Sequence, residues 1–122
     1  MLGVKYLEIP VRDIERAVRF YEFVFGVELE RALVDGYAMA HFPTPGDGKG
    51  AEVALAQGDV YVPSKAGVIV YFHVADIDAV MSRASERGAA TLYTKKEVSP
   101  GVWVAEFEDA EGNRVALSQT SE

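Results

Sequence analysis

The sequence contains no cysteine and few basic residues, and each shortage excludes a class of chemistry. Without cysteine, disulfide frameworks, zinc fingers and cysteine nucleophiles are all excluded. Lys and Arg number 12 against 19 Asp and Glu, so the formal net charge of the 122 residues is −7. A chain this acidic repels the phosphate backbone, which argues against nucleic acid as a partner.

Long apolar runs are also missing. No stretch approaches the roughly 18 apolar residues of a membrane-spanning helix, and no apolar run follows a basic one at the N-terminus, as a signal peptide requires. We therefore expect a cytoplasmic protein without a membrane partner. Hydrophobic residues at 49% and charged residues at 25% are typical of a globular domain.

A repeated stretch is the main feature that is present. Three residues of the first half recur in the second half at one constant spacing: Val11, Asp13 and Ile14 reappear as Val74, Asp76 and Ile77. In each copy a strand pattern leads to a capping aspartate and then to an amphipathic helix that stops at a glycine, Gly26 or Gly88. Two copies of this length indicate a duplicated module and not a solenoid.

The order of predicted elements is the same in both copies. The first module is expected to hold strands 4–11, 27–34, 37–42 and 52–57 with a helix over 13–26; the second, strands 68–74, 89–93, 102–108 and 114–119 with a helix over 76–88. The chain is thus predicted to be a single domain, 1–122, made of modules 1–57 and 67–122 with a linker over 58–66. The Pro- and Gly-rich stretch 43–50 lacks the spacing of a phosphate-binding loop and is expected to be a connector.

Two segments resemble the vicinal-oxygen-chelate superfamily, which includes glyoxalases, bleomycin-resistance proteins and extradiol dioxygenases. Residues 13–26 are similar to its helix, with an aspartate, a Phe-Tyr pair and a closing glycine; residues 107–114 are similar to its Phe-x-Asp-Pro-x-Gly-Asn turn, with Ala110 in place of proline. The resemblance implies an α+β fold in which two tandem βαβββ modules form a curved eight-stranded mixed sheet around a cavity. It also implies a divalent metal between the modules, acting as a Lewis acid.

The residues at the family's metal-ligand positions argue against that metal. The resemblance places these positions on the first and last strands of each module, at Tyr6, Ala54, Ile69 and Ala116. Three of the four side chains have no donor atom, and a tyrosine offers one weak oxygen near neutral pH. We therefore expect no metal and no other cofactor at the usual site.

Several other side chains are candidates for binding a ligand. Strand alternation places Tyr6 with Glu8, Tyr71 with His73, and Arg114 with Ala116, each on one face of its strand. Trp103 either stacks on a planar ligand or packs in the core. The predicted ligand-binding residues are therefore Tyr6, Glu8, Tyr71, His73, Trp103 and Arg114. Glu8 is either a general base or a structural partner of Arg114 or Tyr71.

Two functional interpretations follow. The first is a metal-free protein that binds a small, partly aromatic or cationic molecule in the cavity, as the resemblance to the bleomycin-resistance branch implies. The alternative is a glyoxalase-type lyase, isomerase or dioxygenase with relocated metal ligands, drawn from Glu8, His41, His73 and Glu106. His41 and Glu106 lie near strand ends, where polar side chains are often only solvated. A cavity without a selected ligand is a third option.

A homodimer is expected. Sheets of this kind leave open edges, and closed two-fold pairing is the commonest way to protect them.

Overall fold

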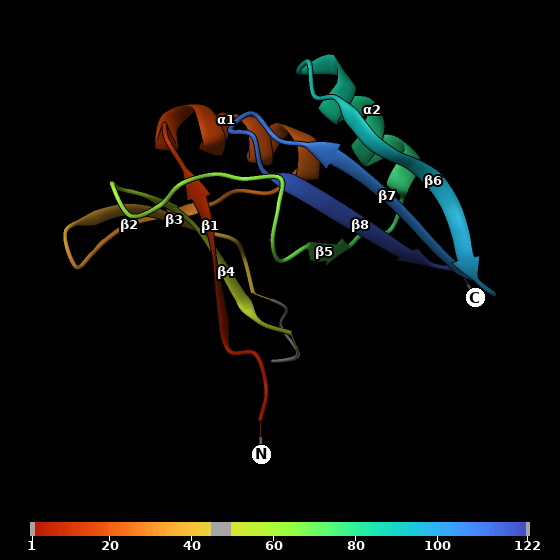
Figure 1. The fold of residues 1–122 in the computed structure, drawn as a ribbon, viewed down its shortest axis with the longest axis horizontal. Coiled ribbons are helices and arrows are strands. Elements are labelled where there is room, and N and C mark those ends of the chain that lie inside the picture. The colour runs from red at the N-terminus through yellow and green to blue at the C-terminus, as the bar shows by residue number, and fades with distance from the viewer. Residues whose placement is uncertain (1, 45–49, 122) are drawn as a thin grey trace. The chain divides into compact units, whose positions relative to one another are not determined.

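The structure is a computed structural model that describes residues 2–44 and 50–121. The chain divides into two compact units, residues 1–63 and 64–122. Each unit follows the order strand, helix, strand, strand, strand (Figure 1). The α+β class and the two βαβββ modules are therefore confirmed. Most of the predicted connector 43–50, residues 45–49, lies outside the described residues.

The first unit pairs one helix with a four-stranded mixed sheet. Its elements are β1 (Tyr6–Val11), α1 (Ile14–Phe25), β2 (Glu30–Val34), β3 (Tyr37–His41) and β4 (Glu52–Gln57). The strands lie in the order β1-β4-β3-β2; β1 runs parallel to β4, and the other two pairings are antiparallel.

The second unit repeats this topology. Its elements are β5 (Val70–His73), α2 (Ile77–Glu86), β6 (Thr91–Ser99), β7 (Val102–Glu108) and β8 (Arg114–Thr120). The strand order is β5-β8-β7-β6, with β5 parallel to β8. None of the helices in the described part of the chain is long and apolar enough to cross a membrane.

In each unit the helix covers one face of its own sheet, and this contact forms the core. Apolar residues recur at helical spacing along α1, which buries Ile14, Ala17, Val18, Phe20, Tyr21 and Val24. The facing positions of β1 and β4 are buried too, including Ile9, Val11 and Leu55. We call the opposite side of each sheet the helix-free face.

Both helices begin at the predicted aspartates. Asp13 accepts a hydrogen bond from the backbone N–H of Arg16, and Asp76 accepts one from Ala79, each at 3.1 Å. Each carboxylate thus satisfies one of the amide donors that a helix start leaves unpaired. Gly26 ends α1 in the left-handed conformation, with φ of 65°.

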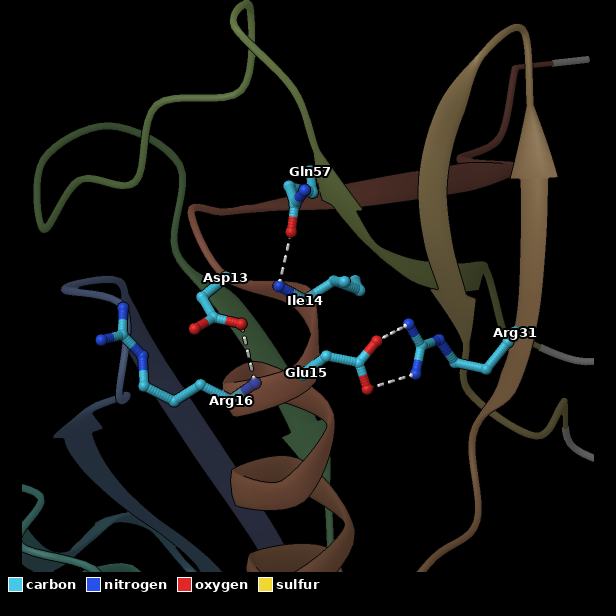
Figure 2. A network of polar contacts seen from close by, with 6 residues as sticks. All are labelled: Asp13, Ile14, Glu15, Arg16, Arg31 and Gln57. Carbon is cyan, nitrogen blue, oxygen red and sulfur yellow. Dashed lines mark hydrogen bonds and ion pairs between the residues drawn. The ribbon is translucent and has the colours of Figure 1, made fainter.

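Glutamines at the ends of the last strands cap the same helices a second time. The backbone N–H of Ile14 donates to Gln57 Oε1, and that of Ile77 donates to Gln119 Oε1, each at 2.7 Å. Figure 2 shows the first of these bonds beside the Asp13 cap and the pairing of Glu15 on α1 with Arg31 on β2. The last strand of each module is therefore tied to the start of its helix.

The family-like turn between β7 and β8 is held by its aspartate. Asp109 Oδ1 accepts from the backbone N–H groups of Glu111 and Asn113, both at 2.8 Å, and Gly112 supplies a φ of 95°. Only glycine adopts such a φ without strain. The turn closes without a proline, so Ala110 is compatible with this geometry.

The clearest departure from the predicted elements is β6. A strand was expected over 89–93, but β6 runs from Thr91 to Ser99 and pairs with β7 through three irregularities in register. All nine of its residues are exposed. Lys95-Lys96-Glu97 gives no alternating apolar pattern, because neither face of this edge strand is buried.

Candidate functional site

The helix-free face of the first sheet carries the polar residues predicted from β1. In the strand register Glu8 lies opposite Ala54 of β4, and Ala54 lies opposite His41 of β3. Paired residues project to the same side of a sheet. Glu8 and His41 therefore flank Ala54, which is fully buried at 0% exposure.

The carboxylate of Glu8 is held by two tyrosines. The Tyr6 hydroxyl donates to Glu8 Oε2 at 3.0 Å, and the Tyr61 hydroxyl donates to Glu8 Oε1 at 2.9 Å. Tyr6 and Glu8 are two residues apart on one strand, whereas Tyr61 follows β4 in the predicted linker. We call these three residues the tyrosine–glutamate cluster.

A tight turn after β4 brings Tyr61 to this cluster. The Tyr61 N–H donates to the carbonyl of Gly58 at 2.9 Å. The Tyr37 ring meets that of Tyr61 edge to face, with centroids 5.4 Å apart. The ring of Tyr37 lies so close to Gly58 that an added Cβ would be 2.3 Å from it, so any larger residue at position 58 would displace this ring.

The contacts to Glu8 change the acidity of both phenols. Partial burial and the hydrogen bond to Glu8 raise the pKa of Tyr6 from about 10 to about 12. The hydrogen bond to Glu8 also raises the pKa of Tyr61. Ionising either phenol next to the carboxylate would place two negative charges side by side. Both tyrosines are therefore neutral donors at physiological pH.

The helix-free face of the second sheet carries a different polar set. Tyr71 of β5 lies opposite Ala116 of β8, which lies opposite Glu106 of β7. Glu106 is only 5% exposed, and its Oε1 accepts from Nε of Arg114 at 2.5 Å. The expectation that Glu106 would be solvated is therefore wrong, because Arg114 compensates its charge within the sheet.

The structure brings together only part of the predicted ligand-binding set. Tyr71, His73 and Arg114 share the helix-free face of the second sheet with Ala116, as the register requires. Trp103 pairs with Gln119, whose side chain caps α2, so it lies on the helix side. There Nζ of Lys95 sits 5.2 Å from the centre of its ring.

The side chains at the four positions that the resemblance implies as metal ligands do not fit a metal. Ala54 and Ala116 occupy matching places in the two sheets, and both are fully buried without a donor atom. Ile69 has no donor, and the Tyr6 hydroxyl already donates to Glu8. Divalent metals need several oxygen, nitrogen or sulfur ligands, which these side chains do not supply.

The proposed substitutes for those ligands are divided between the units, with Glu8 and His41 in the first and His73 and Glu106 in the second. Within each unit, the described residues include no group of three or more His, Cys, Asp or Glu side chains placed to hold a metal ion. Glu8 is engaged by two phenols, Glu106 by Arg114, and the His41 ring stacks with Tyr6 at 6.4 Å between centroids.

Sequence reasoning missed Tyr61 and the two capping glutamines. Tyr61 lies in a segment without periodicity, and its approach to Glu8 depends on the turn at Gly58. Gln57 and Gln119 had a usable signal: each stands near the end of the last strand of its module, so the duplication itself points to a shared role.

Comparison with known proteins identifies the family. A family model described as the Glyoxalase/Bleomycin resistance protein/Dioxygenase superfamily matches residues 3–117. The chain belongs to this superfamily. A relative from Didymella fabae, named a glyoxylase-like domain-containing protein, is 30% identical over an alignment of 115 residues that covers 91% of this chain and 88% of the relative.

Solved structures share the superfamily fold along the whole chain. A glyoxylase/bleomycin resistance protein/dioxygenase domain from Frankia sp. EAN1pec is 23% identical with a TM-score of 0.75, covering 100% of this chain and 94% of that one. TnmS3 from Streptomyces sp. CB03234, described as an antibiotic binding protein, is 25% identical with a TM-score of 0.71, covering 99% and 98%.

Proposed function

We propose that this superfamily member binds a small organic molecule on the helix-free faces of its sheets, without the metal centre usual in the family. The observation that carries this proposal is the donor set at Tyr6, Ala54, Ile69 and Ala116, where no divalent ion finds adequate ligands. The similarity to TnmS3, described as an antibiotic binding protein, supports a binding role.

The alternative is a glyoxalase-type enzyme with relocated ligands. It is the weaker candidate because Glu8 and Glu106, two of its four possible ligands, are already engaged by hydrogen-bond donors. Releasing Glu106 from Arg114 would leave a buried charge without compensation, which is costly.

A metal titration separates the two candidates. Because a ligand that binds only the folded state raises the melting temperature, we expect Zn²⁺, Ni²⁺ and Mn²⁺ to leave that temperature unchanged. A melting temperature that rises with metal and falls again with chelator would favour the enzyme, especially if Glu8→Gln or His73→Ala abolished the rise.

Binding itself is tested with a library of small organic molecules of mixed charge. We expect some members to raise the melting temperature in a dose-dependent way and to perturb amide resonances of β1, β4, β5 or β8. A library without a single such member, screened up to millimolar concentration, would contradict the binding proposal.

We also propose that the chain forms a homodimer. Each sheet ends in edge strands, and the nine exposed residues of β6 form one such edge. Paired edges are protected from unwanted association. Light scattering at micromolar concentration should give twice the mass of the chain, which is 13.3 kDa. A mass of one chain would refute this proposal.

A further inference from the structure

We infer that the tyrosine–glutamate cluster of Tyr6, Glu8 and Tyr61 recognises an organic cation, so that the ligand of this protein carries an ammonium group next to an apolar body. This inference rests on the proposed binding function and names the chemical class of its ligand. It is argued from the hydrogen bonds, the rings and the charges around Glu8.

The hydrogen bonds hold the carboxylate in place without neutralising it. Each oxygen of Glu8 accepts one phenol hydroxyl, from Tyr6 or Tyr61. A carboxylate oxygen has two lone pairs, so each oxygen keeps an acceptor site for a ligand. Phenol donors orient the group and leave its full negative charge.

In the described part of the chain, no short ion pair offsets that charge. Among residues 2–44 and 50–121, Glu8 forms no ion pair with Lys or Arg. Two further acidic residues act on the tyrosines of the cluster: Glu52 acts electrostatically on Tyr6, and Asp35 acts on Tyr61. The local field therefore attracts cations and repels anions.

Aromatic rings surround the same carboxylate. Tyr6 stacks with His41, while Tyr61 meets Tyr37 edge to face. The faces of such rings attract ammonium groups, most strongly when water is excluded. Carboxylate and rings together favour a cation with apolar substituents over a metal ion, which would need more oxygen ligands.

The cluster is also built before any ligand arrives. Tyr6 and Glu8 are fixed by the β1–β4 pairing, and Tyr61 by the turn from Gly58. Rigid binding groups lose little conformational entropy when a ligand binds. Glu8 is itself exposed, so a ligand can reach the carboxylate that the two hydroxyl groups hold in place.

The test uses three probes of one shape class: benzylammonium, benzyl alcohol and benzoate. Titrations of the full chain, followed by amide resonances of β1 and of residues 58–61, should show the cation binding most tightly. Benzoate should bind most weakly, because it meets the charge of Glu8.

Glu8→Gln is the decisive variant, because it removes the charge and keeps a side chain of the same shape. It should weaken binding of the cation by about three- to tenfold and leave the affinity for benzyl alcohol unchanged. Glu28→Gln is the matched control, since Glu28 is exposed outside the sheet and its loss changes the net charge equally. The control should retain full affinity.

Three outcomes would overturn the inference. Equal losses in Glu8→Gln and Glu28→Gln would mean that only the overall acidity attracts the cation. Binding of benzyl alcohol or benzoate without binding of the cation would contradict the ligand class and leave the proposed binding function intact. Failure of all three probes to bind would also contradict the inferred ligand class. The binding function itself is tested separately with the mixed library.

Discussion

At the scale of single residues, two effects raise the pKa of the Tyr6 hydroxyl. Tyr6 is 37% exposed, and its hydroxyl donates to Glu8. Burial disfavours the phenolate, and the adjacent carboxylate disfavours it further. Both effects act in the same direction, which is why the pKa of Tyr6 reaches about 12.

We expect Tyr6 to be among the last of the six tyrosines to ionise when the folded protein is titrated by ultraviolet absorbance. Below pH 10 both folded and unfolded chains keep this proton. Between about pH 10 and pH 12 the unfolded chain releases it first, so the free energy of unfolding should fall across this window.

Glu8→Gln provides the control for that titration. It should lower the pKa of Tyr6 only part of the way, because burial persists when the charge is gone. An unchanged pKa in this variant would show that Glu8 does not act on the phenol. Urea unfolding at several pH values measures the matching change in stability.

Single residues were predicted unevenly from the sequence. Alternation along β1 correctly placed Tyr6 and Glu8 on one face, because that strand has one buried side. Trp103 was grouped with Arg114, but the register places it on the helix side. Glu106, which shares the face of Arg114, lies three positions along β7 from Trp103. An odd spacing puts two residues of a strand on opposite faces, so the sequence already contained this distinction.

At the scale of elements, the glutamine caps join each helix to the far end of its own module. Gln57 and Gln119 accept from the first amide of α1 and α2. A helix start leaves four amides without partners, and here the neighbouring aspartate satisfies another of them. Each helix therefore depends on a strand as well as on its own sequence.

We expect Gln57→Ala to lower the free energy of unfolding by about 1 kcal/mol, the usual cost of losing a helix cap. Gln57→Glu should retain most of this stability, because a carboxylate accepts the same bond and favours the helix N-terminus. Urea unfolding measures both. If both variants lost the same free energy of unfolding, the hydrogen-bond acceptor at position 57 would not be the source of the stabilisation.

The sequence predicted the limits of the strands best where both faces are buried. The strand limits of β4 and β7 were predicted correctly, and both helices begin directly after their aspartates. The limits of β6 were wrong, because a strand exposed on both faces carries no apolar alternation. The turn over residues 58–61 was also missed, since this segment has no periodicity that would predict it.

At the scale of the whole molecule, the size of each module limits its stability. Each unit packs one helix on four strands, and its length is close to sixty residues. A domain of about that size buries only some 60% of its unfolded surface and is marginally stable alone. A chain of 122 residues buries a larger share, roughly two thirds, which is why a single domain over the whole sequence is predicted.

We therefore expect one cooperative unfolding transition for the chain, with equal calorimetric and van't Hoff enthalpies. Gln57→Ala, which affects only the first module, should shift that single transition to lower temperature. Two transitions, with only one of them moved by the substitution, would mean that the modules unfold independently.

The parallel pairing of β1 with β4 sets an order of events during synthesis. During synthesis β1 has to wait for its hydrogen-bonding partner until residue 57 emerges, and α1 receives its glutamine cap at the same moment. At about 5 to 20 residues per second, translating the second module takes a further 3 to 13 seconds or so. In that interval β1 can pair with β4 and the groups around Glu8 can come together, while the lasting stability of the first half still depends on the second.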